Sequence, residues 1–581
     1  MAQDISSAEK PSSITARTPF DLSRLWRRQL DHYPPARQRY SYLAITVLST
    51  VVLYYELYVQ GAVATTIITT YGVGFTKFVM IAVVGSLLGA FASLAAGLAD
   101  RWGRANLVTG GLFVTGLLVL FGLPMAPNVD VYAAFFILLS IVEGMVLVAT
   151  PALIRDFSPQ MGRATAMGFW TLGPVLGSLL VTTISSNTLD SHPDWQFQFR
   201  VCGAIGVIVA VIALLGLREL SPALRDQLMV SLRDRALIEA RAAGIDPDRA
   251  LEGQWRQMLK LDVLGSAFAI SVYLIFYYIS VGFFVVYFAT VFDYPEARAN
   301  ALANWYWLST AIALVASGFL SDRLRVRKPF MIGGALLSAG AIAVFASLST
   351  ETETGYYHFA TVLVLIGSGT GFAYCAWMAS FTETVERHNP AATATGLAVW
   401  AWINRIVVTL ALAGFTLALP AVSTLVDQGH HVSEISARYQ PQLETLRALE
   451  PPTKTAILSG TQDPGVREVA VEQLVRSGLA ADVATADARL RQLATDPIPR
   501  ADQEFLATEG PVVTAAMKDN PAQWQRWWFV CLIGQLAFIP LVFVMAGRWS
   551  PKRAREDEAR HQVYIEQEMK KLGITESSGA Q

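Results

Sequence analysis

Long uncharged runs recur along the chain and alternate with short polar stretches. A helix needs roughly 20 apolar residues to cross a hydrocarbon core of about 30 Å. A lipid-facing backbone must also satisfy its own N–H and C=O groups, which favours helices. We therefore predict an all-α membrane protein with twelve transmembrane helices. The predicted spans are residues 40–76, 78–99, 105–129, 131–154, 164–189, 201–217, 263–292, 299–321, 329–350, 354–382, 388–426 and 527–547.

The distribution of charge supports this interpretation. Lys, Arg, Asp and Glu make up 16% of the 581 residues, below the roughly 25% of soluble globular proteins. Most of these charges lie in four stretches, 1–39, 218–262, 421–524 and 548–581, so that the other 359 residues carry only 28 of them. A water-exposed surface cannot be built from so few charges. This excludes a soluble enzyme, a disordered chain and a fibrous protein.

Basic residues predict the orientation of the spans. The tail 1–39 has seven Lys or Arg and segment 218–262 has eight, whereas segments 126–130 and 349–357 have none. Because short cytoplasmic segments are enriched in Lys and Arg, we expect both termini in the cytoplasm. The predicted location is the plasma or inner cell membrane.

Two hydrophilic blocks interrupt the apolar pattern. Residues 218–262, between spans six and seven, are predicted to form short amphipathic helices. Residues 421–524, between spans eleven and twelve, have helical periodicity over 466–480 and 482–494 and are predicted to form a small extracytoplasmic cap with a thin core. The expected regions are an N-terminal tail (1–39), a six-helix bundle (40–217), a cytoplasmic linker (218–262), a second bundle (263–420), the helical insertion (421–524), the last span (525–547) and a C-terminal tail (548–581).

The two sets of six spans have similar charged segments at equivalent places. Segment 97–104 follows span two, and the related segment 318–328 follows span eight. Charges at 155–156 follow span four, and those at 383–387 follow span ten. Two bundles related by an axis along the membrane normal are typical of some secondary transporters. The chain is therefore predicted to contain two pseudo-symmetric six-helix bundles.

The first of these segments makes the similarity more specific. Asp100, Arg101, Gly103 and Arg104 match the loop pattern Gly-x-x-x-Asp-Arg/Lys-x-Gly-Arg/Lys, in which the leading glycine is displaced to Gly97. Over about residues 40–420 and 525–548 the chain resembles a twelve-helix member of the major facilitator superfamily. The resemblance implies a transporter fold, and the insertion 421–524 lies outside the common family pattern.

The loop charges are candidates for a latch that holds the inner gate in one state. Charge-assisted hydrogen bonds between neighbouring helices could provide it. A solvated turn that follows the orientation rule is the alternative, which two copies at matching places disfavour. The candidate gating residues are Asp100, Arg101, Arg104, Arg155, Asp156, Asp322, Arg323 and Glu383.

Two acidic residues lie near mid-span, Glu56 in span one and Glu143 in span four. Placing a charge there costs about 2.5–3.5 kcal/mol or more, so such residues normally face a cavity, a partner or an ion path. Tyr55 and Glu56 are similar to the Tyr-Asp pair of sugar and metabolite symporters, which implies that Glu56 takes the coupling proton. A structural partner of an arginine is the alternative. Glu143 could be a second proton site or a buried hydrogen-bond partner.

Arg405, in span eleven, could bind a substrate anion or neutralise Glu143. Gln60 lies one helical turn from Glu56 on the same face. Four aromatic residues in spans seven and ten could line a pocket, although an interfacial aromatic belt is an alternative for such residues. The candidate substrate-binding residues are Gln60, Tyr273, Tyr277, Tyr374, Trp377 and Arg405.

Span five contains Gly173, Pro174 and Gly177. Their spacing resembles part of the Gly-Pro-x-x-Gly-Gly motif of proton-driven exporters. These residues predict a bendable, closely packed helix. Ordinary packing of small residues is the alternative.

These features favour a proton-coupled secondary transporter that moves a small polar or anionic organic metabolite by alternating access. The carboxyl group in span one favours symport, and the motif in span five favours the alternative, a drug/proton antiporter. A remote alternative is a membrane receptor or scaffold that uses residues 421–524. No P-loop motif appears in the sequence, and an enzyme is not expected.

The sequence predicts no cofactor and no metal site, because the seven histidines lack metal-ligand spacing. A net charge of −1 offers no general attraction to nucleic acid. Cys202, Cys375 and Cys531 fall in apolar runs, so no disulfide framework is expected. The expected partners are a small-molecule substrate, protons and the lipid bilayer, with the protein acting as a monomer.

Overall fold

The computed structural model describes residues 28–93, 103–158, 163–221, 224, 258–351, 353–388, 393–460, 463–552, 555, 556, 559, 560 and 563. For residues 148, 155, 163–169, 386, 393 and 394 only the backbone is described. Asp100 and Arg101, most of the predicted linker 218–262 and most of the two tails therefore lie outside the described residues.

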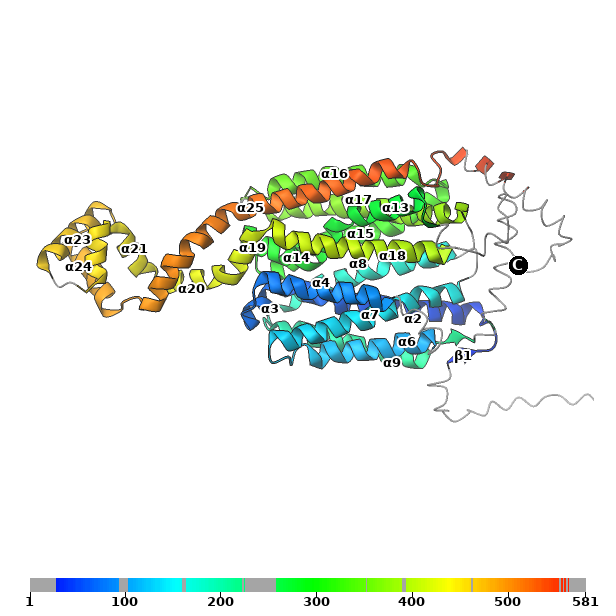
Figure 1. Cartoon of the computed structure of the whole chain (residues 1–581), viewed down its shortest axis with the longest axis horizontal. Helices are drawn as coiled ribbons and strands as arrows, with labels where there is room; N and C mark the ends of the chain where they lie inside the picture. Colours follow the sequence, from blue (N-terminus) through cyan, green and yellow to red (C-terminus); the bar gives the residue numbers. More distant parts are fainter. Residues whose placement is uncertain are drawn as a thin grey trace, which may run out of the picture.

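The first half of the bundle is formed by long helices that run side by side (Figure 1). A single residue, Val63, separates α2 from α3, and a π-helical turn, η2, continues α6. The elements are α2 (Ala36–Ala62), α3 (Ala64–Tyr71), α4 (Phe75–Ala92), α6 (Arg104–Leu117), η2 (Leu118–Gly122), α7 (Val129–Phe157), α8 (Arg163–Thr188) and α9 (Trp195–Gly216).

The second half repeats this arrangement and packs on the first through α8 with α15, α2 with α14, and α4 with α18. The seventh predicted span of the chain, residues 263–292, is the first of this half and is divided at Leu274 into two helices. The elements are α13 (Leu261–Tyr273), α14 (Ile275–Phe292), α15 (Glu296–Leu324), α16 (Lys328–Leu348), α17 (Tyr356–His388), α18 (Thr393–Ala418) and α25 (Arg500–Val542).

Within the described residues, ten helical segments are long and apolar enough to cross a membrane. The two long helices outside this set are α8 and α15, which pack against each other between the halves. The polar side chains of Glu296, Asn300 and Asn304 on α15 bond to the first half, so this face is turned away from lipid. The all-α membrane fold is confirmed, and the count of twelve spans stays a prediction.

Residues 420–499 form short helices that project beyond one end of the bundle (Figure 1). We call this part, together with the first turns of α25, the projection, and the end of the bundle beside it the projection end. The elements are α19 (Pro420–Thr424), the π-helical η5 (Leu425–Gly429), α20 (His430–Arg438), α21 (Gln440–Ala448), α22 (Pro451–Leu458), α23 (Pro464–Arg476) and α24 (Val483–Thr495).

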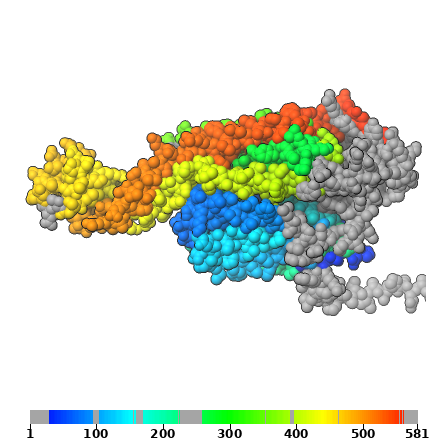
Figure 2. Space-filling view, in the orientation of Figure 1, coloured from blue at the N-terminus to red at the C-terminus, as the bar shows by residue number. Residues whose placement is uncertain are grey.

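The projection has two small apolar clusters of its own. One is centred on Ala470, Leu474 and Leu490, and the other contains Ile435 and Tyr439. The helices α23 and α24 overlap most of the two predicted helical stretches, 466–480 and 482–494, and residues 477–480 lie beyond the end of α23. Figure 2 shows that α25 connects the projection to the bundle as one continuous rod.

The helix α25 joins the projection to the aromatic core of the second half. Trp524 is fully buried and stacks on Trp528, with ring centroids 5.3 Å apart. Tyr287 on α14 packs against both rings. Trp524 therefore belongs to the core of the bundle, although the predicted insertion ends at residue 524.

The opposite end of the bundle, which we call the terminal end, contains a short parallel pairing between β1 (Gln29–Leu30) and β2 (Glu219–Leu220). Arg28, beside β1, is buried and donates to the carbonyl oxygen of Ala105 and the hydroxyl of Thr109. Burial lowers the pKa of Arg28 to about 10, against the opposing effect of Glu219. These contacts fasten the chain before α2 to the ends of the first-half helices.

Candidate functional site

A cavity of about 1900 Å³ lies between the two halves. Residues from α2, α4, α7 and α8 line it on one side, and residues from α14, α15, α17 and α18 line it on the other. It extends to the terminal end, where Arg104, Asp322 and Arg327 form part of its wall. Because both halves contribute, a movement of one half against the other would change the shape of the cavity.

At the projection end, hydrogen bonds across the halves close the cavity. The carboxylate of Glu296 on α15 accepts bonds from the hydroxyl and backbone N–H of Thr66, at 2.7 and 3.0 Å, and from the hydroxyl of Thr65. The amide of Asn300 donates to the carbonyl oxygen of Ala62 at 2.9 Å. The side chain of Asn304 bonds to hydroxyl groups on α8.

The element η5 of the projection adds a further contact at this end. Asp427 on η5 accepts a hydrogen bond from the backbone N–H of Phe75, at the start of α4, with an N···O distance of 2.6 Å. A carboxylate is favoured at this position because a helix N-terminus has unsatisfied N–H groups. Burial raises the pKa of Asp427, while the bonds from Phe75 and Ser423 oppose this shift. The element η5 is therefore bound to α4 of the first half and also packs on α25 of the second.

Glu143 on α7 lines the cavity and is 1% exposed. Both of its carboxyl oxygens are buried and have no hydrogen-bond partner among the described residues. The backbones of α4 and α7 approach closely beside it, because a side chain at Gly144 would overlap the carbonyl oxygen of Gly89. The carboxyl group is therefore held at the wall by tightly packed helices and has no cation paired with it within the described chain.

Glu56 on α2 has a different position. It is fully buried and is not among the residues that line the cavity. Its carboxyl group is buried beside Thr115 and Gly206, between α6 and α9. Glu56 and Glu143 lie close enough to interact electrostatically. The structure thus places two carboxyl groups in the first half, one at the cavity and one behind it.

Arg405 on α18 is the cationic counterpart in the second half. It lines the cavity, and its Nη1 donates to the carbonyl oxygen of Gly89 on α4 at 3.2 Å. The hydroxyl groups of Tyr54 and Tyr278 lie close enough to interact with it. No carboxylate forms an ion pair with Arg405 within the described chain. The guanidinium therefore faces the cavity and retains hydrogen-bond donors for a ligand.

The predicted aromatic residues divide into two groups. Tyr277 and Tyr374 line the cavity, whereas Tyr273 and Trp377 do not. Tyr273 packs against Phe538, and Trp377 is buried behind Tyr374 and stacks on Phe381 at 4.8 Å. The helix break at Leu274 explains why Tyr273 and Tyr277 diverge, since they share a face only in a continuous helix.

Gln60 lines the cavity near its closed end and accepts a hydrogen bond from the hydroxyl of Tyr132 at 2.9 Å. The wall also contains Tyr54, Tyr278 and Trp400, which the sequence did not single out. Asn404 donates to the hydroxyl of Tyr278 at 2.7 Å and so orients that ring beside Arg405. The interior of the cavity is therefore rich in aromatic side chains.

In the first half, the predicted loop charges form an ion pair at the terminal end. Nη1 of Arg104 lies 2.8 and 2.9 Å from the two carboxylate oxygens of Asp156 on α7. Glu219, which the sequence did not single out, accepts from the backbone N–H of Arg104 at 2.6 Å and caps α6. The side chain of Arg155 and all of Asp100 and Arg101 lie outside the described part of the chain.

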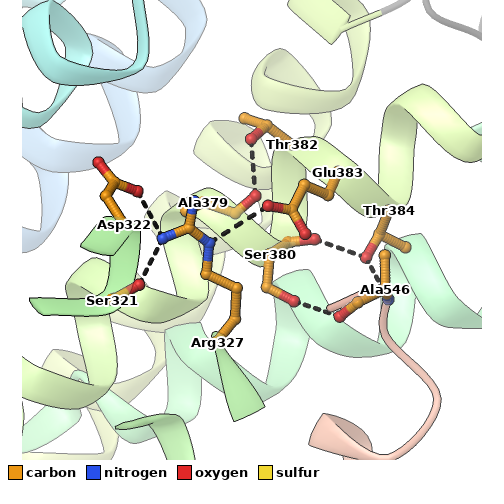
Figure 3. A network of polar contacts seen from close by, with 9 residues as sticks. All are labelled: Ser321, Asp322, Arg327, Ala379, Ser380, Thr382, Glu383, Thr384 and Ala546. Carbon is orange, nitrogen blue, oxygen red and sulfur yellow. Dashed lines mark hydrogen bonds and ion pairs between the residues drawn. The ribbon is translucent and has the colours of Figure 1, made fainter. Parts of the chain in front are cut away.

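The matching network of the second half is centred on Arg327, between α15 and α16 (Figure 3). Its side chain lies 2.7 Å from Asp322 and 3.2 Å from Glu383, and it also bonds to Ser321. The predicted partner Arg323 has no ion pair within the described ranges. The positional match between the two loops led to Arg323, but the geometry brings Arg327 to the carboxylates.

Comparison with known protein families agrees with this architecture. A sequence profile described as Major Facilitator Superfamily matches residues 46–411, which is more than half of the chain. The chain belongs to the major facilitator superfamily. It is accordingly a multi-pass membrane protein of a transporter family, and the loop resemblance read from residues 97–104 is consistent with this membership.

Solved structures of other superfamily members have the same fold. A bacterial homologue of the human lysosomal transporter Spinster, in an inward-facing and occupied conformation, superposes with a TM-score of 0.53 at 16% identity, covering 88% of this chain and 97% of the other. A double-tryptophan mutant of XylE gives a TM-score of 0.51 at 14% identity, covering 67% and 90%. At these identities the likeness shows the fold alone.

A curated relative matches only a short part of this superfamily member. The chain is 29% identical over 98 residues to the efflux pump radE of Floropilus chiversii, which is 17% of this chain and 18% of that protein. The match therefore spans less than a fifth of the relative.

The predicted motif of span five lies on α8, at its contact with α2. A side chain at Gly177 would come within about 3 Å of the α2 backbone at Val51 and Tyr55. Pro174 lies inside the helix, and the hydroxyl of Ser178 donates to its carbonyl oxygen at 3.0 Å. In this member of the superfamily the small residues allow close helix packing, and the bending role of Gly173, Pro174 and Gly177 stays a prediction.

Proposed function

We propose that this protein is a proton-coupled secondary transporter that moves an organic anion through the central cavity by alternating access. The observation that carries the proposal is the presence of one carboxyl group and one guanidinium group on opposite walls of the same cavity. Glu143 belongs to the first half and Arg405 to the second. Each half therefore contributes one chemical function.

The proposed role of Arg405 is to bind the anionic group of the substrate. Its present acceptor is the uncharged carbonyl oxygen of Gly89, and a ligand carboxylate would form stronger, charge-assisted bonds. Gln60, Tyr277 and Tyr374 line the same cavity and would contact the rest of the substrate. Tyr273 and Trp377 would support this wall from behind.

The proposed role of Glu143 is to carry the coupling proton. A bound proton removes a charge that is costly to enclose when the cavity closes around it. Glu56, buried nearby, would serve as a second proton-binding group behind the wall. Substrate binding at Arg405 and proton binding at Glu143 would then be coupled, because both accompany the same movement of the halves.

The structure would represent the state that is open at the terminal end. We place the protein as a monomer in the plasma membrane, with both termini in the cytoplasm. The terminal end then faces the cytoplasm, so this state is inward-open. Conversion to the opposite state would break the contacts of Glu296, Asn300 and Asn304 and bring the terminal ends together. The charges at Arg104, Asp156, Asp322, Arg327 and Glu383 would hold the helices of each half together during this movement.

The test is transport by the full-length protein in proteoliposomes with an imposed pH gradient of either sign. For Glu143→Gln, we expect accumulation driven by the gradient to fall at least tenfold while exchange of substrate across equal pH continues, because exchange needs no net proton movement. Glu56→Gln should reduce accumulation less. Glu351→Gln, at an exposed glutamate of the projection end, is the matched control. Unchanged accumulation by Glu143→Gln would refute the proton-carrying role.

A drug/proton antiporter is the second candidate. The aromatic wall of the cavity and the short match to an efflux pump favour it. The same experiment separates the two, since a symporter accumulates substrate when the outside is acidic and an antiporter when the outside is alkaline.

A further inference from the structure

The helix α18 contributes a continuous run of residues to the wall of the cavity. Every residue from 397 to 405 lines the cavity. Nine residues make two and a half turns of an α-helix, so more than one face of α18 contributes atoms to the wall. A helix with one face toward a cavity would contribute only every third or fourth residue. The wall of the cavity therefore includes more of α18 than its inner face.

The helices α18 and α4 pack against each other along a line that we call the seam, and Arg405 lies at this seam. Arg405 on α18 donates to the carbonyl oxygen of Gly89 on α4, which places its guanidinium at the seam. Phe91 lies two residues after Gly89, and Trp402 lies one turn before Arg405. Both line the cavity, and they are 56% and 45% exposed. Large aromatic side chains thus flank the cation on both helices.

Charge in the lining is confined to a few places. Of the described charged residues in the wall, Arg104, Asp322, Arg323 and Arg327 lie at the terminal end, and Arg104 and Arg327 are already ion-paired. Only Glu143 and Arg405 lie deeper. A single interior cation among Tyr54, Tyr278, Tyr374 and Trp400 suits a ligand with one anionic group and an apolar body.

We propose that the substrate is an amphipathic organic anion that reaches Arg405 from the surrounding bilayer through the seam between α4 and α18. Its charged group binds the guanidinium, and its apolar part lies on Phe91, Trp402 and the aromatic wall. The exposed flanks allow passage of a chain that already lies in lipid, so the apolar part does not have to cross water. This inference rests on the proposed function, because it takes Arg405 as the anion site.

Two alkyl sulfonates provide the probe, butanesulfonate and octanesulfonate. Both stay ionised, so their binding does not depend on their own protonation. Binding to the purified full-length protein in nanodiscs is measured by calorimetry. We expect octanesulfonate to bind at least tenfold more tightly, since burying apolar surface strengthens binding by up to about fourfold per methylene group. Arg405→Gln should remove binding of both, and Arg405→Lys should restore part of it.

Substitutions of Trp402, an exposed residue of the seam, test whether the bound anion reaches it. Trp402→Glu places a negative charge where the apolar chain of the bound anion lies, and we expect it to weaken octanesulfonate binding at least fivefold more than Trp402→Gln does. Trp305→Glu is the matched control, because Trp305 is a similarly exposed tryptophan, 41%, outside the cavity lining. Thermal unfolding of each variant identifies any that fail to fold.

The outcomes separate the two proposals. Equal binding of both sulfonates through Arg405, with no difference between Trp402→Glu and Trp402→Gln, would refute a ligand site that extends into the seam and leave the anion transporter intact. Sulfonate binding that does not depend on Arg405 would refute both. A steep chain-length dependence that requires Arg405 and is sensitive to charge at residue 402 would support the inference.

Discussion

The two ends of the bundle are held together in different ways. At the projection end, Glu296, Asn300 and Asn304 of the second half bond directly to the first half. At the terminal end, the described ion pairs of Arg104 and Arg327 each connect helices of the same half. Contacts across the halves therefore determine which end is closed, and contacts within a half keep each bundle rigid while it moves. This difference predicts which substitutions shift the conformation and which only loosen one half.

The largest effect is expected at Gly61, where α2 meets α14. A side chain there would overlap the carbonyl oxygen of Val281, so the two backbones would have to separate. Overpacking of this kind costs about 3 kcal/mol when backbone rather than a side chain must move. We expect Gly61→Val to open the projection end in most molecules. Labelling of a cysteine placed at Ser280, in a background without other cysteines, by a membrane-impermeant reagent measures this.

Gly282→Val is the matched control for that experiment, since it lies on the facing helix and a side chain there would meet nothing within 4 Å. Equal labelling of the two variants would show that close contact between α2 and α14 does not keep this end closed.

An intermediate effect is expected for Glu296→Gln. Hydrogen bonds to a charged group contribute about 1.5–3 kcal/mol, and the substitution removes the charge from the contacts with Thr65 and Thr66. The fraction of molecules open at the projection end should rise roughly tenfold or more, measured by the same labelling. Glu353→Gln, at an exposed glutamate near this end, should leave labelling unchanged, and a similar rise for both variants would contradict the assignment.

The smallest effect is expected for Arg327→Gln. Its partners Asp322 and Glu383 are 55% and 39% exposed, and exposed ion pairs contribute at most about 1 kcal/mol. We expect a small decrease in the melting temperature and no change in labelling at the projection end. Arg323→Gln should change neither quantity. A conformational shift in Arg327→Gln would mean that this network also acts across the halves.

The candidate site could be predicted only in part, and three pairs of residues explain why. Glu56 and Glu143 were both recognised as charges within spans, but spacing along a helix does not show which one faces the cavity. Tyr273 and Tyr277 share a predicted face, yet the break at Leu274, which has neither glycine nor proline beside it, separates them. The loop pattern singles out Arg323, whereas the start of α16 carries Arg327 to the carboxylates.

The sequence by itself determined the membrane location, the helical fold and the division into two similar halves, because lipid restricts where charge and unpaired backbone groups can lie. It also identified Glu143 and Arg405, since an ionisable group within an apolar span is conspicuous whatever it faces. Only the tertiary structure decided that these two groups share one cavity, that this cavity is closed at the projection end and that its wall includes more than one face of α18. Those properties depend on contacts between helices that are distant along the chain, and no local pattern encodes them.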